Sequence, residues 1–256
     1  MNNNNNGRLA GLSVILTGAA GNIGSFISRR LLREGAQLVM TGRNADKLDA
    51  FIDELADEGY ARDAMVAAVG DCADPEVCRR IVATAVEHFE RVDVLINNAG
   101  GAGPKRTLRD IPFTAADKKA NGDDETMFEA AMNLLGGPWN MVRAAVPHMG
   151  PGGSIVNVSS IFSRTRYFGR IPYVVPKSGL NALSLGLARE LGPEKGIRVN
   201  TVFPGPIESQ RIDDVFAAMD DLQDMPSGTT SDEFRQLMIG SRADESGELE
   251  RRYSKP

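Results

Sequence analysis

A serine, a tyrosine and a lysine within one short stretch have the types and the spacing for proton transfer. Tyr173 and Lys177 lie four residues apart, so on a helix that begins near Pro172 their side chains share one face. A phenol has an ordinary pKa of about 10, and an adjacent ammonium favours its phenolate. Tyr173 is therefore a candidate general acid and base. An amphipathic helix with a chance tyrosine and lysine is the competing interpretation.

The segments on either side of this pair predict elements that hold it in place. Residues 154–158 are typical of a strand, which would deliver Ser159 and Ser160 at its end. After the pair, leucines recur at helical spacing and predict a buried face: Leu180, Leu183, Leu187 and Leu191. Pro176 fits the first turn of this helix, because the amides of a first turn have no intrahelical partner to lose.

A glycine-rich turn near the start of the chain predicts a dinucleotide-binding site. Residues 12–17 read as a strand, and a helix with apolar residues at helical period follows the turn. Such a turn lets the backbone approach a pyrophosphate and aims the free amides of the helix N-terminus at the phosphates. The candidate cofactor contacts in the turn are Gly18, Gly21, Asn22, Ile23 and Gly24.

The end of the next predicted strand indicates which dinucleotide would bind. Residues 37–40 lead into Thr41, Gly42 and Arg43, where an NAD site usually offers an acid to the ribose 2′-hydroxyl. No acid stands at that point of the sequence. Arg43 could instead bind a 2′-phosphate, which favours NADPH (NADP) as the cofactor, while a solvated surface arginine is the alternative interpretation.

Two further strands end in residues that suit a nucleotide. Residues 64–69 lead to Asp71, which could accept a hydrogen bond from the adenine amine. Residues 92–96 lead to Asn97, Ala99 and Gly100, which are small or polar where backbone must pass close to a ribose and a nicotinamide. Strands alternate with helices throughout, so we expect an α/β fold with a Rossmann-type doubly wound parallel sheet and helices on both faces.

The second half of the chain predicts a surface excursion at 101–125, a helix at 125–149 and a sixth strand at 197–202. Asn133 lies inside that helix, where its amide must find a backbone or water partner. The sixth strand ends in Pro204, Gly205, Pro206 and Ile207.

The organisation that follows has three parts. We expect residues 1–7 to be a disordered tail and 8–207 to be the dinucleotide-binding catalytic domain. Residues 208–256 are charged and helix-prone, with a break at 225–228, and are assigned to a substrate lid and a truncated C-terminal segment.

The composition favours a cytoplasmic enzyme that acts on a small molecule. The chain has 256 residues, 42% of them hydrophobic, which suffices for one substantial core. A net charge of -5 argues against nucleic acid as the main partner, and no apolar run reaches membrane-spanning length. Cys72 and Cys78 have no nearby histidine or further cysteine, so we predict neither a metal site nor a structural disulfide.

Several motifs in order resemble the short-chain dehydrogenase/reductases across residues 8–207: TGAAGNIG, Asp71, NNAG, Asn133, Ser160, Tyr173 with Lys177, and PGPI. The resemblance implies that Ser160 hydrogen-bonds the substrate carbonyl and that Tyr173 gives it a proton. It also implies that Lys177 binds the ribose and lowers the pKa of the tyrosine, and that Asn133 holds a relay water. The PGPI residues Pro204, Gly205 and Ile207 would contact the cofactor.

The sequence departs from that family in two places. Asn22 stands where the middle glycine is usual, and the chain stops before the last strand and helix that normally complete the sheet. We therefore expect a fragment of a longer polypeptide with an uncovered sixth strand, and association into a homo-oligomer.

A closer resemblance concerns IFSRTRYFGRIPYVVPKSGLNALS and IRVNTVFPGPIESQRI, which are similar to the N-terminal reductase part of bifunctional malonyl-CoA reductases. It implies reduction of malonate semialdehyde to 3-hydroxypropionate with NADPH. Three arginines near the catalytic residues, Arg164, Arg170 and Arg211, are candidates to bind the substrate carboxylate. A general short-chain alcohol dehydrogenase or 3-oxoacyl reductase, and a non-catalytic NADP-binding module, are the alternatives. The presence of Ser160, Tyr173 and Lys177 favours catalysis.

Overall fold

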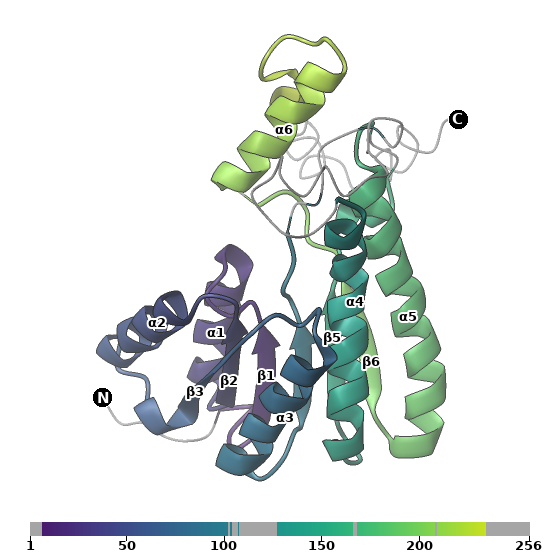
Figure 1. Ribbon diagram of the computed structural model, residues 1–256. Helices are drawn as coiled ribbons and strands as arrows, with labels where there is room; N and C mark the ends of the chain where they lie inside the picture. The colour runs from purple at the N-terminus through teal and green to yellow at the C-terminus, as the bar shows by residue number, and fades with distance from the viewer. Residues whose placement is uncertain are drawn as a thin grey trace. The chain divides into compact units, whose positions relative to one another are not determined.

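The structure is a computed structural model that describes residues 7–101, 103, 107, 127–165, 168–207 and 209–233. Within these residues the chain forms a parallel sheet whose strands follow the order β3-β2-β1-β4-β5-β6 (Figure 1). The strands are β1 (Ser13–Thr17), β2 (Gln37–Gly42), β3 (Met65–Val69), β4 (Val94–Asn97), β5 (Ser154–Val158) and β6 (Arg198–Val202). The strand order reverses between β1 and β4, so the predicted doubly wound Rossmann-type sheet is confirmed.

The strands are joined through helices, as the alternating pattern of the sequence predicts. These are α1 (Asn22–Arg33), α2 (Ala45–Asp57), α3 (Pro75–Phe89), α4 (Met127–Ala145), α5 (Ile171–Lys195) and α6 (Gln210–Leu222), with short 3₁₀ turns η1 (Arg62–Ala64), η4 (Val146–His148) and η5 (Ile161–Ser163). Local capping explains two of the starts. The Asn44 side chain accepts from the Lys47 amide at 2.8 Å, and the Asp74 side chain accepts from the Glu76 amide at 2.8 Å.

The sheet is covered on both faces, because alternate side chains of each strand enter different cores. Ile15 of β1 packs with residues of α3, α4 and α5, whereas its neighbours Val14 and Leu16 pack with residues of α1 and α2. Strands that are buried on both faces are expected in a parallel sheet of this kind. None of the helices in the described part of the chain has the length and apolar content needed to cross a membrane.

Polar side chains also lie inside the sheet, at the ends of β4 and β5. Asn97 and Asn157 are paired in register, and the Asn97 amide donates to Asn157 Oδ1 at 2.8 Å. Asn157 Nδ2 donates to Ser184 Oγ at 2.8 Å, and Ser184 Oγ donates to the Leu180 carbonyl at 2.7 Å. This chain of hydrogen bonds connects two strands to α5 through side chains that are almost fully buried.

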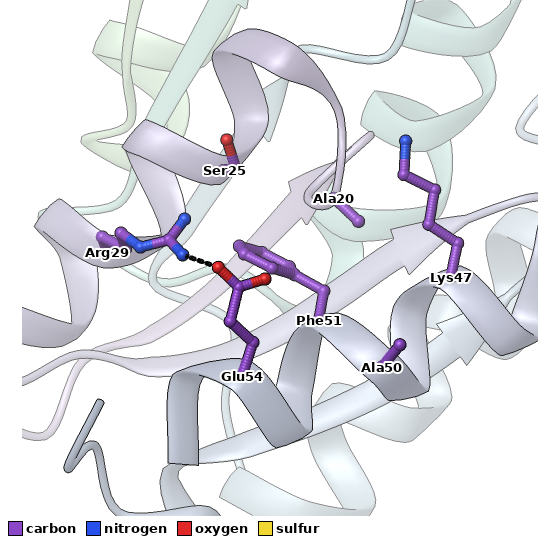
Figure 2. Close-up of a pocket in the computed structure, with 7 residues that line it drawn as sticks. All are labelled: Ala20, Ser25, Arg29, Lys47, Ala50, Phe51 and Glu54. Carbon is purple, nitrogen blue, oxygen red and sulfur yellow. Dashed lines mark hydrogen bonds and ion pairs between the residues drawn. The ribbon is translucent and has the colours of Figure 1, made fainter. Parts of the chain in front are cut away.

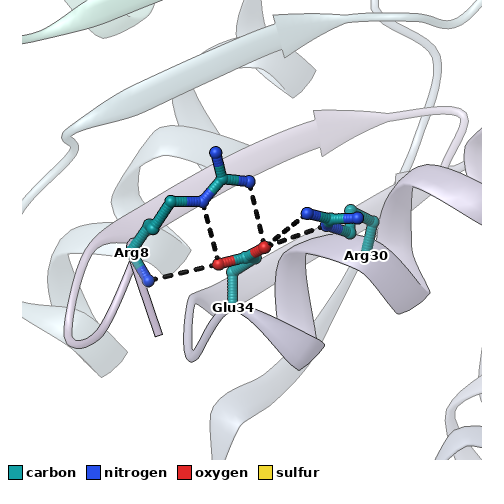
Figure 3. A network of polar contacts seen from close by, with 3 residues as sticks. All are labelled: Arg8, Arg30 and Glu34. Carbon is teal, nitrogen blue, oxygen red and sulfur yellow. Dashed lines mark hydrogen bonds and ion pairs between the residues drawn. The ribbon is translucent and has the colours of Figure 1, made fainter. Parts of the chain in front are cut away.

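A carboxylate at the end of α1 fastens the segment before β1. Glu34 Oε2 accepts from the Arg8 backbone amide at 3.2 Å and from Arg8 Nε at 3.1 Å, and Arg30 donates to Oε1 (Figure 3). These bonds, above all the side-chain bond from Arg8, lower the pKa of Glu34 to about 2.

The chain divides by its contacts into two compact units. Unit 1 holds the whole sheet described above and comprises the described residues up to 101, together with 133–159 and 179–203. Unit 2 comprises the described residues within 102–132, 160–178 and 204–233. β6 is the last strand in the order, and Val202 at its end is exposed. The predicted excursion at 101–125 and the Asn run at 2–6 lie almost entirely outside the described residues.

Candidate functional site

The glycine turn of unit 1 has a backbone that side chains would obstruct. Gly18 has a φ of +67°, and a Cβ at this position would lie 3.0 Å from the Cα of Ala99. A Cβ at Gly24 would overlap the carbonyl oxygen of Gly18. Gly21 is the N-cap of α1, and Asn22 is its first helical residue. Asn22 therefore adopts ordinary helical backbone, and the missing middle glycine leaves the turn intact.

Hydrogen bonds from β4 hold this turn in place. Thr17 Oγ1 accepts from the backbone amides of Asn98 and Ala99, each at 2.9 Å, and donates to the Ile96 carbonyl. The side-chain amide of Asn98 donates through Nδ2 to the carbonyls of Thr17 and Gly18 at 3.0 and 3.2 Å. Sequence reasoning missed Thr17 and Asn98 as positioning residues, although both lie inside the motifs it used. They fix the turn so that the α1 N-terminus is available to an anion, which fits a dinucleotide pyrophosphate.

The ends of β2 and β3 bring together the two residues predicted for the adenosine half of a dinucleotide. Arg43 Nη1 lies 3.6 Å from Asp71 Oδ2, and both side chains are substantially exposed. Asp71 Oδ1 accepts from the Ala73 amide at 2.9 Å, which orients the carboxylate. An exposed ion pair of this kind is weak, so Arg43 can exchange Asp71 for a stronger anion such as a phosphate.

A pocket of about 270 Å³ lies between α1 and α2 (Figure 2). Its lining is formed by Ala20, Ser25, Arg29, Lys47, Ala50, Phe51 and Glu54. Arg29 is neutralised there by Glu54 and Glu58, and its guanidinium lies 5.1 Å from the centroid of the Phe51 ring. None of the predicted site residues lines this pocket, which touches the glycine turn at Ala20.

The predicted cofactor residues after β4 have different environments. Asn97 is buried and donates to Asn157, so its side chain supports the sheet. Ala99 lies against Gly18, and Gly100 follows it. Asn133, on α4, is half-buried and also belongs to unit 1.

In unit 2, Ser160 is placed directly after β5 and is buried. Its Oγ accepts from the Phe162 amide at 3.2 Å, and its carbonyl accepts from Ser163 Oγ at 2.6 Å. Because the oxygen of the hydroxyl is already an acceptor, the hydroxyl hydrogen points to another partner. Ser160 can therefore donate to a carbonyl oxygen.

Tyr173 and Lys177 occupy the first two turns of α5, in the same unit as Ser160. Their four-residue spacing on a helix is confirmed and puts them on one face. Lys177 is 4% exposed, and burial lowers its pKa to about 8. The explanation of Pro176 was wrong. The helix begins at Ile171, so Pro176 lies in the second turn and the Pro172 carbonyl loses its helical donor.

Aromatic packing fixes the tyrosine ring. The rings of Phe162 and Tyr173 meet edge to face, with centroids 6.3 Å apart. Phe162 belongs to a small core with residues of α6, namely Val215, Phe216 and Met219, against which Tyr173, Val174 and Ile212 pack. This arrangement explains how the segment after residue 208, predicted as a lid, supports the proton-transfer residues. It is a contact that no local sequence pattern reveals.

The three predicted substrate arginines differ in their surroundings. Arg164 is exposed at the end of η5. Arg170 is 2% exposed, and its guanidinium carbon lies 4.8 Å from the centroid of the Tyr173 ring. Arg211 lies on α6, and its side chain is outside the described residues.

The PGPI turn that follows β6 belongs to unit 2. The Pro204 carbonyl accepts from the Ile161 amide at 3.0 Å, which attaches the turn to η5. Gly205 and Ile207 are exposed beyond it, and the Ile207 carbonyl accepts from Ser209 Oγ at 3.1 Å. Unit 2 thus combines a hydroxyl donor, a phenol with a neighbouring ammonium, and exposed backbone. Such a set can protonate a carbonyl oxygen that is gaining negative charge.

Comparison with known proteins matches residues 13–220 to the family described as short chain dehydrogenase. A 1,6-dihydroxycyclohexa-2,4-diene-1-carboxylate dehydrogenase of Pseudomonas putida is 36% identical over 206 residues, which cover 80% of this chain and 70% of the relative. Among solved structures, a short chain dehydrogenase of Burkholderia cenocepacia in complex with NADP is similar with a TM-score of 0.68. It is 31% identical, over 80% of this chain and 78% of that one.

A second solved structure is more similar. The N-domain of a bacterial malonyl-CoA reductase, crystallised with NADP, has a TM-score of 0.81 and 47% identity over 89% of this chain. The matched region covers 43% of that protein's chain. The present chain therefore spans less than half of that structure's chain.

Proposed function

Because this chain is a member of the short-chain dehydrogenase family, and so an oxidoreductase that acts on CH–OH groups, we propose that it reduces a small aldehyde acid with NADPH. The proposed substrate is malonate semialdehyde, and the proposed product is 3-hydroxypropionate. The observation that carries the proposal is the placement of Ser160, Tyr173 and Lys177 in one unit, with the two helical residues on one face of α5.

Proton transfer is assigned to these residues. Ser160, whose oxygen already accepts from the Phe162 amide, donates its hydroxyl hydrogen to the substrate carbonyl oxygen. Tyr173 gives a proton to the same substrate oxygen as that oxygen gains the negative charge of an alkoxide. Lys177 then favours the phenolate that remains on Tyr173. Asn133 is assigned the water that returns a proton to the site.

NADPH supplies the hydride when it is bound. The turn residues Gly18, Gly21, Asn22, Ile23 and Gly24, at the α1 N-terminus, would hold the pyrophosphate. Arg43 would exchange its ion pair with Asp71 for the 2′-phosphate, and Asp71 would accept from the adenine amine. Ala99, Gly100, Pro204, Gly205 and Ile207 provide backbone contacts, Asn97 supports them through Asn157, and Lys177 also binds the ribose.

The choice of an acid as substrate rests on the arginines of unit 2. Arg164 is exposed and can meet a soluble carboxylate with the planar two-point contact that a guanidinium offers. Arg164 is exposed whereas Arg170 is 2% exposed, so we place the carboxylate first on Arg164, with Arg170 and Arg211 as alternatives. The similar malonyl-CoA reductase N-domain supports malonate semialdehyde as the acid. By the same similarity we propose that the chain works in the cytoplasm as part of a longer polypeptide that forms homo-oligomers.

The test compares malonate semialdehyde with an uncharged aldehyde of similar size, by following cofactor absorbance with NADPH and with NADH. We expect the acid and NADPH to be preferred. Arg164→Ala should lose roughly ten- to a hundredfold in kcat/KM for the acid, the effect of one charge-assisted hydrogen bond, and little for the uncharged aldehyde. Arg189→Ala, on the exposed side of α5, is the matched control.

Two results would contradict the proposal. Equal reduction of the two aldehydes, or an acid preference that is unchanged in each of Arg164→Ala, Arg170→Ala and Arg211→Ala, would rule out the carboxylate contact and leave an unspecified carbonyl as the substrate. Equal use of NADPH and NADH, or an unchanged preference in Arg43→Ala, would remove the assignment of Arg43.

A further inference from the structure

A buried arginine beside the catalytic phenol is unusual and needs a physical reason. Arg170 is one of the largest fully buried side chains in the described part of the chain. Its guanidinium carbon lies 4.8 Å from the centroid of the Tyr173 ring and 5.8 Å from that of Phe162. A cation within about 6 Å of an aromatic centroid is attracted to the ring face. Arg170 is thus held between the two rings that border the proton-transfer site.

We propose that Arg170 is a positioning residue for Tyr173. Arg170 fixes the tyrosine ring and stabilises the phenolate that remains after Tyr173 has given its proton. The neutral phenol ring already attracts the guanidinium, and the phenolate attracts it more strongly because it carries a negative charge. Both attractions are strengthened by the desolvated surroundings. The same residue also fixes the helix, since the Arg170 carbonyl accepts from the amides of Tyr173 and Val174 at 3.0 and 2.8 Å. Backbone and side chain of Arg170 therefore act on the same tyrosine.

Few charged groups of the described residues surround Tyr173 besides Arg170. Lys177 lies one turn further along α5, and Arg164 is exposed before it. α6 faces the tyrosine and Phe162 with Ile212, Val215, Phe216 and Met219, which are apolar. Its exposed carboxylates are Asp213, Asp214 and Asp221, and the buried Asp220 is bound by Gly228 and Thr230.

The two cations near the phenol respond differently to pH. Burial brings the pKa of Lys177 to about 8, so in the protein without ligands this ammonium loses its charge in mildly alkaline solution. Burial also lowers the pKa of Arg170, but attraction to Tyr173 works in the opposite direction, and the ordinary pKa of a guanidinium is far above that of an ammonium. Arg170 therefore remains a cation where Lys177 does not.

The experiment measures the phenolate directly, without substrate. Phenolate absorbance is followed through an alkaline titration of the wild type, and the titration of Tyr173→Phe is subtracted to isolate this residue among four tyrosines. In Arg170→Gln and Arg170→Met the phenolate should form at a higher pH than in the wild type, because a nearby cation favours the charged form. Arg170→Lys should recover part of the shift, and Arg189→Gln should leave the titration unchanged.

Enzyme kinetics give an independent second measurement. In the direction of alcohol oxidation Tyr173 acts as the base, so Arg170→Gln should lose about tenfold at neutral pH and regain most of it as the pH rises. A residue that only filled space would lower the rate at every pH. The loss should also be the same for charged and uncharged substrates, whereas loss of a carboxylate contact would affect the acid alone.

The inference extends the proposed function but fails separately from it. If the phenolate forms at the same pH in wild type, Arg170→Gln and Arg170→Met, all shown to be folded by circular dichroism, then Arg170 does not act on the phenol. If both neutral variants unfold, the pH profile of alcohol oxidation by Arg170→Lys decides: a loss that shrinks as the pH rises supports the role, and an equal loss at every pH assigns Arg170 to packing alone. If the titration shifts while the aldehydes are not reduced, the positioning role stands and the proposed substrate is wrong.

Discussion

The glycine turn of unit 1 and the tyrosine of unit 2 are held in place by opposite means. The turn depends first on side chains that are absent, since a Cβ at Gly24 would overlap the Gly18 carbonyl, and its two supporting side chains, Thr17 and Asn98, bond only to backbone. Tyr173 depends on side chains that are present, namely Phe162, Arg170 and the apolar face of α6. A phosphate is met by fixed backbone amides, whereas a proton donor needs a tuned environment.

The largest expected effect separates chemistry from cofactor binding. Tyr173→Phe removes the proton donor and keeps the ring against Phe162. Reduction should fall by at least about 10²–10⁴-fold, the contribution of general acid catalysis, while NADPH binding measured by fluorescence titration stays within a factor of two or so. Tyr60→Phe, in unit 1, is the control and should keep full activity. Substantial activity in Tyr173→Phe would end the assignment.

Gly24→Ala is expected to weaken cofactor binding without changing the environment of Tyr173. The added methyl overlaps the Gly18 carbonyl and must displace the turn, which should cost about 1–3 kcal/mol of unfolding free energy and weaken NADPH binding by at least roughly tenfold. The phenolate titration of Tyr173 should stay as in wild type. Gly186→Ala, in α5 where the added methyl meets nothing within 4 Å, should instead stabilise the protein by about 0.5–1 kcal/mol. Denaturant titrations of both variants decide the matter, and equal effects would refute the steric argument.

A smaller loss of stability tests how far the sheet of unit 1 depends on its buried polar side chains. Asn157→Ala removes the partner of both Asn97 and Ser184 inside the sheet. The buried groups left behind should lower the unfolding free energy by about 1–3 kcal/mol, whereas Asn200→Ala at an exposed position of β6 should change it by less than about 0.5 kcal/mol. Chemical denaturation provides the measurement. A neutral outcome for Asn157→Ala would mean that backbone alone maintains this end of the sheet.

The smallest effect concerns Glu34 at the C-terminal end of α1, the end opposite the glycine turn. The pKa of Glu34 is about 2 in the folded protein and near its ordinary value of 4.5 when unfolded, so Glu34 contributes stability above pH 4.5. That contribution is lost as the pH falls toward 2. Glu34→Gln should be slightly less stable than wild type at neutral pH, and the difference should vanish in acid. Glu87→Gln, exposed on α3, is the control. A difference that persists at pH 2 would point to packing.

The contrast between the regions also explains what the sequence could predict. Glycines at 18 and 24 and the four-residue step from Tyr173 to Lys177 are local patterns, and the structure confirms the turn and the shared helix face. The order of the strands follows from alternation of strands and helices, and it is confirmed as well.

Contacts between distant segments could not be predicted in the same way. Phe162 meets Val215 and Met219 of α6 across more than fifty residues, and no periodicity records that meeting. Asn97 is predicted to contact the cofactor, and the structure adds that its side-chain amide donates to Asn157, a contact between strands that the local sequence does not reveal. The catalytic, cofactor-binding and substrate-binding roles of all the predicted site residues, Asn133, Pro204 and Arg211 among them, stay predictions.

The pairing of Asn97 with Asn157 also bears on how the sheet avoids misassembly. Parallel strands rich in valine and isoleucine can slide past one another with little loss of apolar contact, and a slip of one residue reverses the face of every side chain. Such a slip would leave the Asn97 amide opposite an aliphatic neighbour, since Val156 and Val158 flank Asn157. A stranded amide in a dry interior is costly. The two asparagines therefore specify the register of β4 on β5, because the hydrogen bond between them forms in one alignment of the strands and is lost in a shifted one.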